Sequence, residues 1–215
     1  MEEMTWLEEF VEGAQRFCKG FRVRMKEDSW WMRMIGRLMF WNDGFMDCLT
    51  RSGRTVYLPK GAVDIGSMGH ELRHAVDGFR NTNLLVGIVY YFPQWIGLLS
   101  LLSLVAIWGG GGWLWWLVCL VCLLPIPSPG RMMMERRGYL VSLLVVYWKY
   151  GREIALSKVD EVLDLLSGKE YYWAWPFRSG LRSWFEMSLP AGSEYPDDEV
   201  LVWLKEFVRS HPKIF

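Results

Sequence analysis

The stretch Gly69–His74 reads G-H-E-L-R-H and places two histidines four residues apart. On an α-helix this spacing stacks the imidazoles of His70 and His74 on one face, where they can share a tetrahedral zinc ion. Glu71 then projects beside the metal, and its carboxylate can take a proton from a zinc-bound water and pass it to a leaving amine. Because the chain has only 3 histidines, chance is a weak explanation for this arrangement. The motif therefore predicts zinc-assisted hydrolysis, and a solvated helix surface is the alternative.

The charge balance argues against nucleic acid as a partner. Lys+Arg and Asp+Glu both total 24 in 215 residues, and no long basic run occurs, so phosphate groups have no positive patch to bind. Apolar residues reach 52%, with 14 Trp and 12 Met, while charged residues still make up 22%. This composition indicates that charged and apolar stretches are segregated along the chain. The length predicts one domain over residues 1–215 and leaves the oligomeric state open.

A long uncharged segment follows the motif, because no charged residue lies between Arg80 and Arg131. Residues 84–108 are long enough to cross a hydrocarbon core of about 30 Å, whereas the second apolar run, residues 113–126, is short for a full crossing. We therefore expect residues 84–126 to form a membrane hairpin, either transmembrane or re-entrant, in contact with the lipid bilayer. Arginines flank both ends, so an integral membrane protein with its site and termini on the cytoplasmic side is expected. An unusually apolar soluble pair of helices is the alternative.

The remaining sequence predicts a mainly α-helical chain. Residues 30–41 fit either a surface helix or the start of a strand. Amphipathic spacing and capping signals predict helices over residues 5–19, from Val63 or Asp64 to Arg80, from near Arg131 through Trp148, over residues 158–167, and from Asp197 to before Pro212.

Two turn signals predict a small β-hairpin before the motif helix. The turn signals are Asn42-Asp43-Gly44 and Ser52-Gly53. One short strand is expected between them, at residues 45–50, and a second after them, at residues 54–58. A strand beside a zinc site can pair with an extended substrate, and residues 55–58 are placed to do so. An ordinary hairpin without that role is the alternative.

The order of an H-E-x-x-H helix, an apolar hairpin and a further helix bearing Glu135 resembles the membrane-embedded gluzincin metallopeptidases, which include bacterial heat-shock membrane proteases and CaaX-processing proteases. The resemblance covers about residues 54–150 and implies a minimal zincin-like core interrupted by the hairpin. It implies that His70, His74 and Glu135 bind zinc, that Glu71 is the general base, and that the substrate is a peptide or protein.

The chain departs from that family after Glu135. The family's second motif usually has the form E-x-x-x-D or E-x-x-A-D, whereas Tyr139 stands four residues after Glu135. The group that orients the first histidine is therefore open. Tyr139 and Arg136 are both candidates for the oxyanion donor, with Tyr139 the choice for a catalytic role.

Spacing also bears on the third zinc ligand. The extended motif H-E-x-x-H-x-x-G-x-x-H takes its last ligand six residues after the second histidine, where this chain has Arg80. Asp77 lies about 10 Å along the same helix from His70 and cannot converge with both imidazoles. Glu135 is the first acid after Asp77, and Glu153 is the reserve. The leading interpretation is a membrane-associated zinc metallopeptidase; a membrane-anchored interaction protein with a structural or vestigial zinc site is the alternative.

Overall fold

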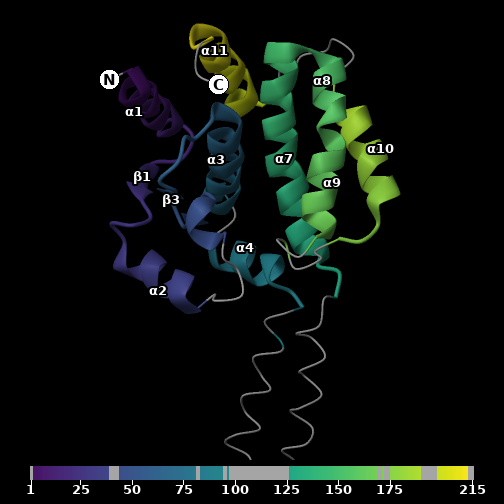
Figure 1. The fold of residues 1–215 in the computed structure, drawn as a ribbon, viewed down its shortest axis with the longest axis horizontal. Coiled ribbons are helices and arrows are strands. Elements are labelled where there is room, and N and C mark those ends of the chain that lie inside the picture. The colour runs from purple at the N-terminus through teal and green to yellow at the C-terminus, as the bar shows by residue number, and fades with distance from the viewer. Residues whose placement is uncertain are drawn as a thin grey trace, which may run out of the picture.

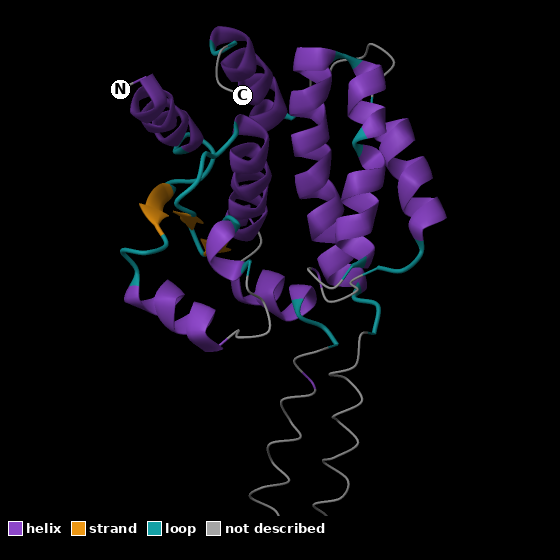
Figure 2. Ribbon diagram, viewed as in Figure 1, coloured by secondary structure: helices purple, strands orange, loops and turns teal. Residues whose placement is uncertain are grey.

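The computed structural model describes most of the chain outside the apolar segment. The described residues are 2–38, 44–80, 83–93, 96, 126–168, 171, 175–189 and 198–212. They form a mainly helical protein with one small sheet, as predicted (Figures 1 and 2). The elements are α1 Glu2–Ala14, β1 Arg22–Met25, α2 Trp30–Leu38, the 3-10 helix η1 Phe45–Asp47, β2 Thr50–Ser52, β3 Thr55–Leu58, α3 Ile65–Arg80, α4 Asn83–Tyr90, α7 Pro129–Tyr150, α8 Arg152–Ser157, α9 Val159–Ser167, α10 Arg178–Ser188 and α11 Glu199–Ser210.

The sheet has the strand order β1-β3-β2. The predicted hairpin is present as the antiparallel pair β2 and β3, but the position predicted for its first strand is wrong: β2 shares only Thr50 with residues 45–50, where η1 occupies Phe45–Asp47. Strand β1 pairs in parallel with β3, with Val23 opposite Val56. Because β3 is the central strand, both of its backbone edges are already paired. The prediction that residues 55–58 pair with a substrate is therefore wrong.

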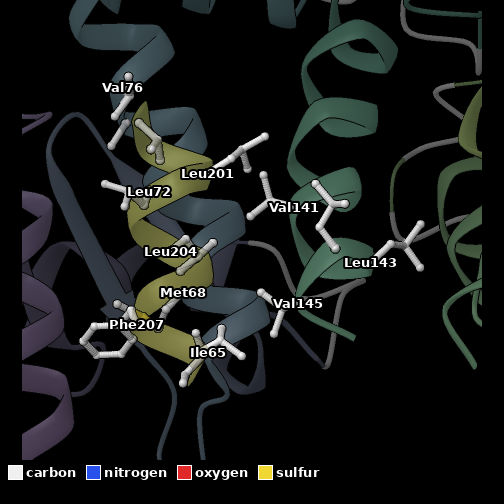
Figure 3. Close-up of a cluster of buried hydrophobic side chains, with 14 of the residues drawn as sticks. Ile65, Met68, Leu72, Val76, Val141, Leu143, Val145, Leu201, Leu204 and Phe207 are labelled. Carbon is white, nitrogen blue, oxygen red and sulfur yellow. The ribbon is translucent and has the colours of Figure 1, made fainter. Parts of the chain in front are cut away.

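Helix α3 packs against both α7 and α11, and the three helices enclose much of the core (Figure 3). Its buried apolar residues recur at the spacing of one helix face. They meet side chains of the two neighbouring helices: Ile65, Met68, Leu72 and Val76 of α3, Val141 and Val145 of α7, and Leu201, Leu204 and Phe207 of α11. At Gly69 an added Cβ would lie 2.8 Å from Leu204 Cδ2 and 2.9 Å from Val141 Cγ1. A side chain at position 69 would therefore force side chains of both neighbouring helices to move.

Residues 30–41 were expected to form either a surface helix or the start of a strand. As far as Leu38 they form a helix, α2. Arg33 and Arg37 follow each other at four-residue spacing on this helix, and Met32 is its buried side chain. The pattern is that of a surface helix with one apolar face.

The predicted transmembrane element and integral membrane location are contradicted. Among the residues that the structure describes, no helix is long and apolar enough to cross a membrane. Helix α4 has 8 residues, a rise of about 12 Å against a hydrocarbon core of about 30 Å. Helix α7 has 22 residues but carries Arg131, Glu135, Arg136 and Arg137. Most of the expected hairpin, residues 84–126, lies outside the described part of the chain.

Candidate metal centre

Helix α3 carries the H-E-x-x-H motif. The helix begins at Ile65, directly after Asp64, whose carboxylate accepts a hydrogen bond from the backbone N–H of Ser67 at 2.8 Å. Such a cap stabilises the first turn. One turn further on, His70 and His74 are both buried, and their Nε2 atoms lie 2.9 Å apart.

Glu135 reaches the two histidines from α7, which lies beside α3 (Figure 1). Its Oε2 is 3.3 Å from His70 Nε2 and 3.6 Å from His74 Nε2, and the residue is 4% exposed. The helices come this close because Gly138, one turn after Glu135, faces His70: a Cβ there would lie 2.7 Å from His70 Nε2. The structure thus brings together His70, His74 and Glu135, the three residues proposed as ligands.

The geometry of these three atoms fits a zinc ion. A tetrahedral ion with bonds of about 2.0–2.1 Å holds its ligand atoms about 3.3 Å apart, and the observed separations are 2.9, 3.3 and 3.6 Å. Oε2 of Glu135 is buried and has no hydrogen-bond partner among the described residues. An unpaired buried carboxylate oxygen is costly unless it meets a cation or a metal. Two imidazoles and one carboxylate are also the ligand set of many hydrolytic zinc sites.

The electrostatics of the cluster favour a cation beside Glu135. Burial raises the pKa of Glu135, but the two facing imidazoles lower it by more, so that this pKa ends well below its usual range. Burial lowers the pKa of His70, yet the close contact with the negatively charged Glu135 outweighs it and leaves this pKa raised. The carboxylate therefore stays ionised, which is the form in which it can bind a metal.

Glu71, the predicted general base, is partly exposed on the same helix. Among the described residues its carboxylate makes no hydrogen bond or ion pair. Burial lowers the pKa of His70 and of Lys26, and the negative charge of Glu71 acts on both in the opposite direction. The residue is therefore accessible to solvent, unlike the buried His70 and His74.

Tyr139 borders the cluster but does not point its hydroxyl at the ligands. Its ring stands edge-on to His70, with centroids 4.6 Å apart. Its hydroxyl donates a hydrogen bond to the hydroxyl of Tyr171 at 2.7 Å. Burial raises the pKa of both tyrosines, so both remain protonated donors at neutral pH. Arg136, the other oxyanion candidate, lies instead over the ring of Trp184 in α10.

Two acids weighed as ligands lie elsewhere. Asp77 pairs with Arg73 and Arg137, at 3.4 and 3.2 Å, and is not a member of the cluster, as its position along the helix predicted. Glu153 is exposed on α8 and is not a member of the cluster.

Sequence reasoning missed Tyr90 and Tyr171. The hydroxyl of Tyr90 donates to Glu135 Oε1 at 2.5 Å. In the sequence Tyr90 is only one aromatic residue near the start of an apolar run, and Tyr171 one of several aromatics in a Trp-rich and Tyr-rich stretch. No local signal sets either apart, because their roles arise from contacts between helices.

Fold and site together define a helical protein with a buried three-residue centre suited to a metal. No protein-family model matches the chain, no curated protein matches its sequence, and no solved structure matches its fold. The resemblance to gluzincin metallopeptidases therefore rests on the motif residues themselves.

Proposed function

We propose that this chain is a zinc-dependent hydrolase that cleaves peptide bonds, with His70, His74 and Glu135 as metal ligands. The observation that carries the proposal is the convergence of one ligand atom from each residue, all within 4.8 Å of one another, from two helices far apart in sequence. Bound zinc supplies a Lewis acid that lowers the pKa of a water molecule and polarises a carbonyl oxygen. The choice of peptide bonds rests on the H-E-x-x-H motif.

Glu71 is the general base of the proposed reaction. Support for this role comes from its position next to His70 in the motif and from the absence of any hydrogen bond or ion pair to the described residues that would hold its carboxylate elsewhere. It would take the proton of the attacking water and deliver that proton to the amine that leaves. Glu71 itself is partly exposed and so can meet water from solvent.

The hydroxyl pair of Tyr139 and Tyr171 is our choice for the oxyanion donor. When Tyr139 donates to Tyr171, the proton of Tyr171 is free to donate to an oxygen that gains negative charge. The edge-on contact of Tyr139 with His70 keeps the pair next to the metal ligands.

A purely structural zinc site is the competing interpretation. Structural zinc sites are closed by four protein ligands, whereas catalytic sites have three and leave one position open. The cluster in the described part of the chain has three members. This count favours catalysis over a structural role.

Glu71→Gln tests the proposal directly. The purified wild-type chain should hold one zinc per molecule after dialysis and should cleave an unfolded protein such as casein. Glu71→Gln should keep its zinc and lose about 10²–10⁴-fold in kcat, because the amide cannot accept a proton.

Glu153→Gln is the matched control, since Glu153 is exposed on α8. It should retain both zinc and activity. Absence of zinc from the wild-type chain, or full activity in Glu71→Gln, would refute the proposed function.

A further inference from the structure

The two carboxylate oxygens of Glu135 have different surroundings. Oε2 faces the imidazoles of His70 and His74, at 3.3 and 3.6 Å. Oε1 accepts a hydrogen bond of 2.5 Å from the hydroxyl of Tyr90, at the end of α4. We propose that Tyr90 is a positioning residue that holds Glu135 as a metal ligand through Oε2 alone. The inference rests on the proposed zinc site.

The surroundings of Tyr90 restrict its movement. The guanidinium of Arg131 lies over its ring, 5.0 Å from the centroid. The buried hydroxyl of Ser128 shares its one proton between the backbone carbonyls of Phe92, at 2.5 Å, and Tyr90, at 3.3 Å. Both Ser128 and Arg131 flank the start of α7, the helix that carries Glu135. The donor and the acceptor of the Tyr90–Glu135 bond are therefore held by the same part of the chain.

Close packing of α4 on α7 brings Tyr90 within reach. At Gly130 a Cβ would overlap the backbone carbonyl of Val89, the residue just before Tyr90. A larger residue at position 130 would push the end of α4 away from α7. Glycine there allows the hydroxyl of Tyr90 to reach a carboxylate five residues further along α7.

Holding one oxygen has a chemical consequence. A free carboxylate can bind a metal through one oxygen or through both, and binding through both would take up the coordination position that a catalytic site keeps open. A hydrogen bond to a charged carboxylate is stronger than one between neutral groups, so Oε1 is committed to Tyr90. Outer-shell partners of this kind orient a ligand and raise metal affinity. Tyr90 thus keeps one metal position available for water or substrate.

Tyr90→Phe removes the hydroxyl and keeps the ring over which Arg131 lies. Zinc affinity, measured by competition with a chromophoric chelator, should fall about 10–100-fold. The visible absorption of the cobalt-substituted protein at saturating metal should change, because the coordination of the ion changes. With casein as substrate, kcat should fall more than KM rises.

Tyr91→Phe is the matched control. Tyr91 is the adjacent residue, is 55% exposed and also lies near Arg131. It should keep the wild-type affinity, cobalt spectrum and kinetics.

The outcomes separate this inference from the proposed function. If the wild-type chain binds neither zinc nor cobalt, the zinc site itself is refuted. If the wild-type chain binds metal and Tyr90→Phe has the same affinity and the same cobalt spectrum, only the role of Tyr90 is refuted. The spectrum at saturating metal reports on the folded, loaded protein, so a loss of stability in the variant does not mask the result.

Discussion

Oε2 of Glu135 lies 3.3 Å from Nε2 of His70, although the two residues belong to different helices, α7 and α3. Both side chains are buried, and Gly138 makes room for the contact. The centre is therefore part of the interface between the two helices. The proposed metal binding would therefore be coupled to the packing of α3 on α7.

Glu135→Ala should weaken zinc binding by more than about 100-fold, beyond the loss typical of an outer-shell change, because it removes a ligand. Peptidase activity should fall with the metal. Glu153→Ala, on the exposed surface of α8, should change neither. Zinc titration of the two variants measures this, and the reverse pattern would contradict the ligand assignment.

Gly138→Ala should damage the centre even though alanine favours helices. The new Cβ would lie 2.7 Å from His70 Nε2 and 2.8 Å from two ring carbons, so the imidazole must move. We expect at least about a 10-fold loss of zinc affinity, comparable to the loss of an outer-shell partner. Gly180→Ala in α10 meets no atom within 4 Å and should leave zinc binding unchanged while adding up to about 1 kcal/mol of stability. Equal zinc affinity in the two variants would show that α7 can shift without disturbing His70.

Lys26 should make stability depend on pH in the alkaline range. The residue is 1% exposed, and burial lowers the pKa of its ammonium from the ordinary 10.5. Between the lowered pKa and 10.5 the unfolded chain binds more protons, so the free energy of unfolding should rise with pH. Urea unfolding at about pH 8 and about pH 10 should show this rise in the wild-type chain but not in Lys26→Met.

Lys60 supplies the control of opposite sign. It is exposed, and its hydrogen bond to Glu27 raises the pKa of its ammonium. The stability that it contributes is present at lower pH and is lost as the pH rises. The free energy of unfolding of Lys60→Met should therefore still rise with alkaline pH, as it does in the wild-type chain. If the free energy of unfolding changed with pH in the same way in the wild type and in Lys26→Met, the pKa of Lys26 would not be lowered in the folded protein.

Asp198→Ala should destabilise the packing of α11. One carboxylate oxygen accepts a hydrogen bond from Arg73 at 2.5 Å, and the other accepts from the N–H groups of Val200 and Leu201 at 3.2 and 3.3 Å. Its loss removes a helix cap and leaves buried Arg73 with a single acidic partner, at a cost of about 2–4 kcal/mol.

Asp164→Ala is the comparison, because Asp164 also pairs with an arginine, Arg178, but on the exposed surface. It should cost less than about 1 kcal/mol. Chemical unfolding of both variants measures the difference. Similar losses would indicate that the Arg73–Asp198 contact behaves as a surface pair.

Local signals predicted the helices that carry the site. The motif helix starts after Asp64 and ends at Arg80, as expected. Both the capping residue and the periodic spacing of apolar residues can be seen within this one segment of the sequence. The last helix follows Asp198, whose side chain caps it. Each depends on contacts within a few residues.

The sheet order depended on contacts that no local pattern reports. Strand β1, Arg22–Met25, pairs with β3 across about thirty residues of sequence, and this pairing makes β3 central. The alternation of polar and apolar residues in Arg-Val-Arg-Met was a local signal for strand β1 itself, but it did not indicate the partner of this strand. The short α4 likewise ends at Tyr90, well before the end of the apolar run that predicted a membrane span.

The sequence alone determined that His70 and His74 share one face of a helix with Glu71 beside them, because helical periodicity follows from residue spacing. The sequence also indicated Glu135 as the third zinc ligand, by elimination of other acids and by the resemblance to gluzincin metallopeptidases. Only the tertiary structure decided that Oε2 of Glu135 meets both imidazoles and that Tyr90 holds Oε1. These contacts depend on how closely α3, α4 and α7 approach. That distance is decided by the packing of glycines against side chains from other helices, which residue spacing within one helix does not encode.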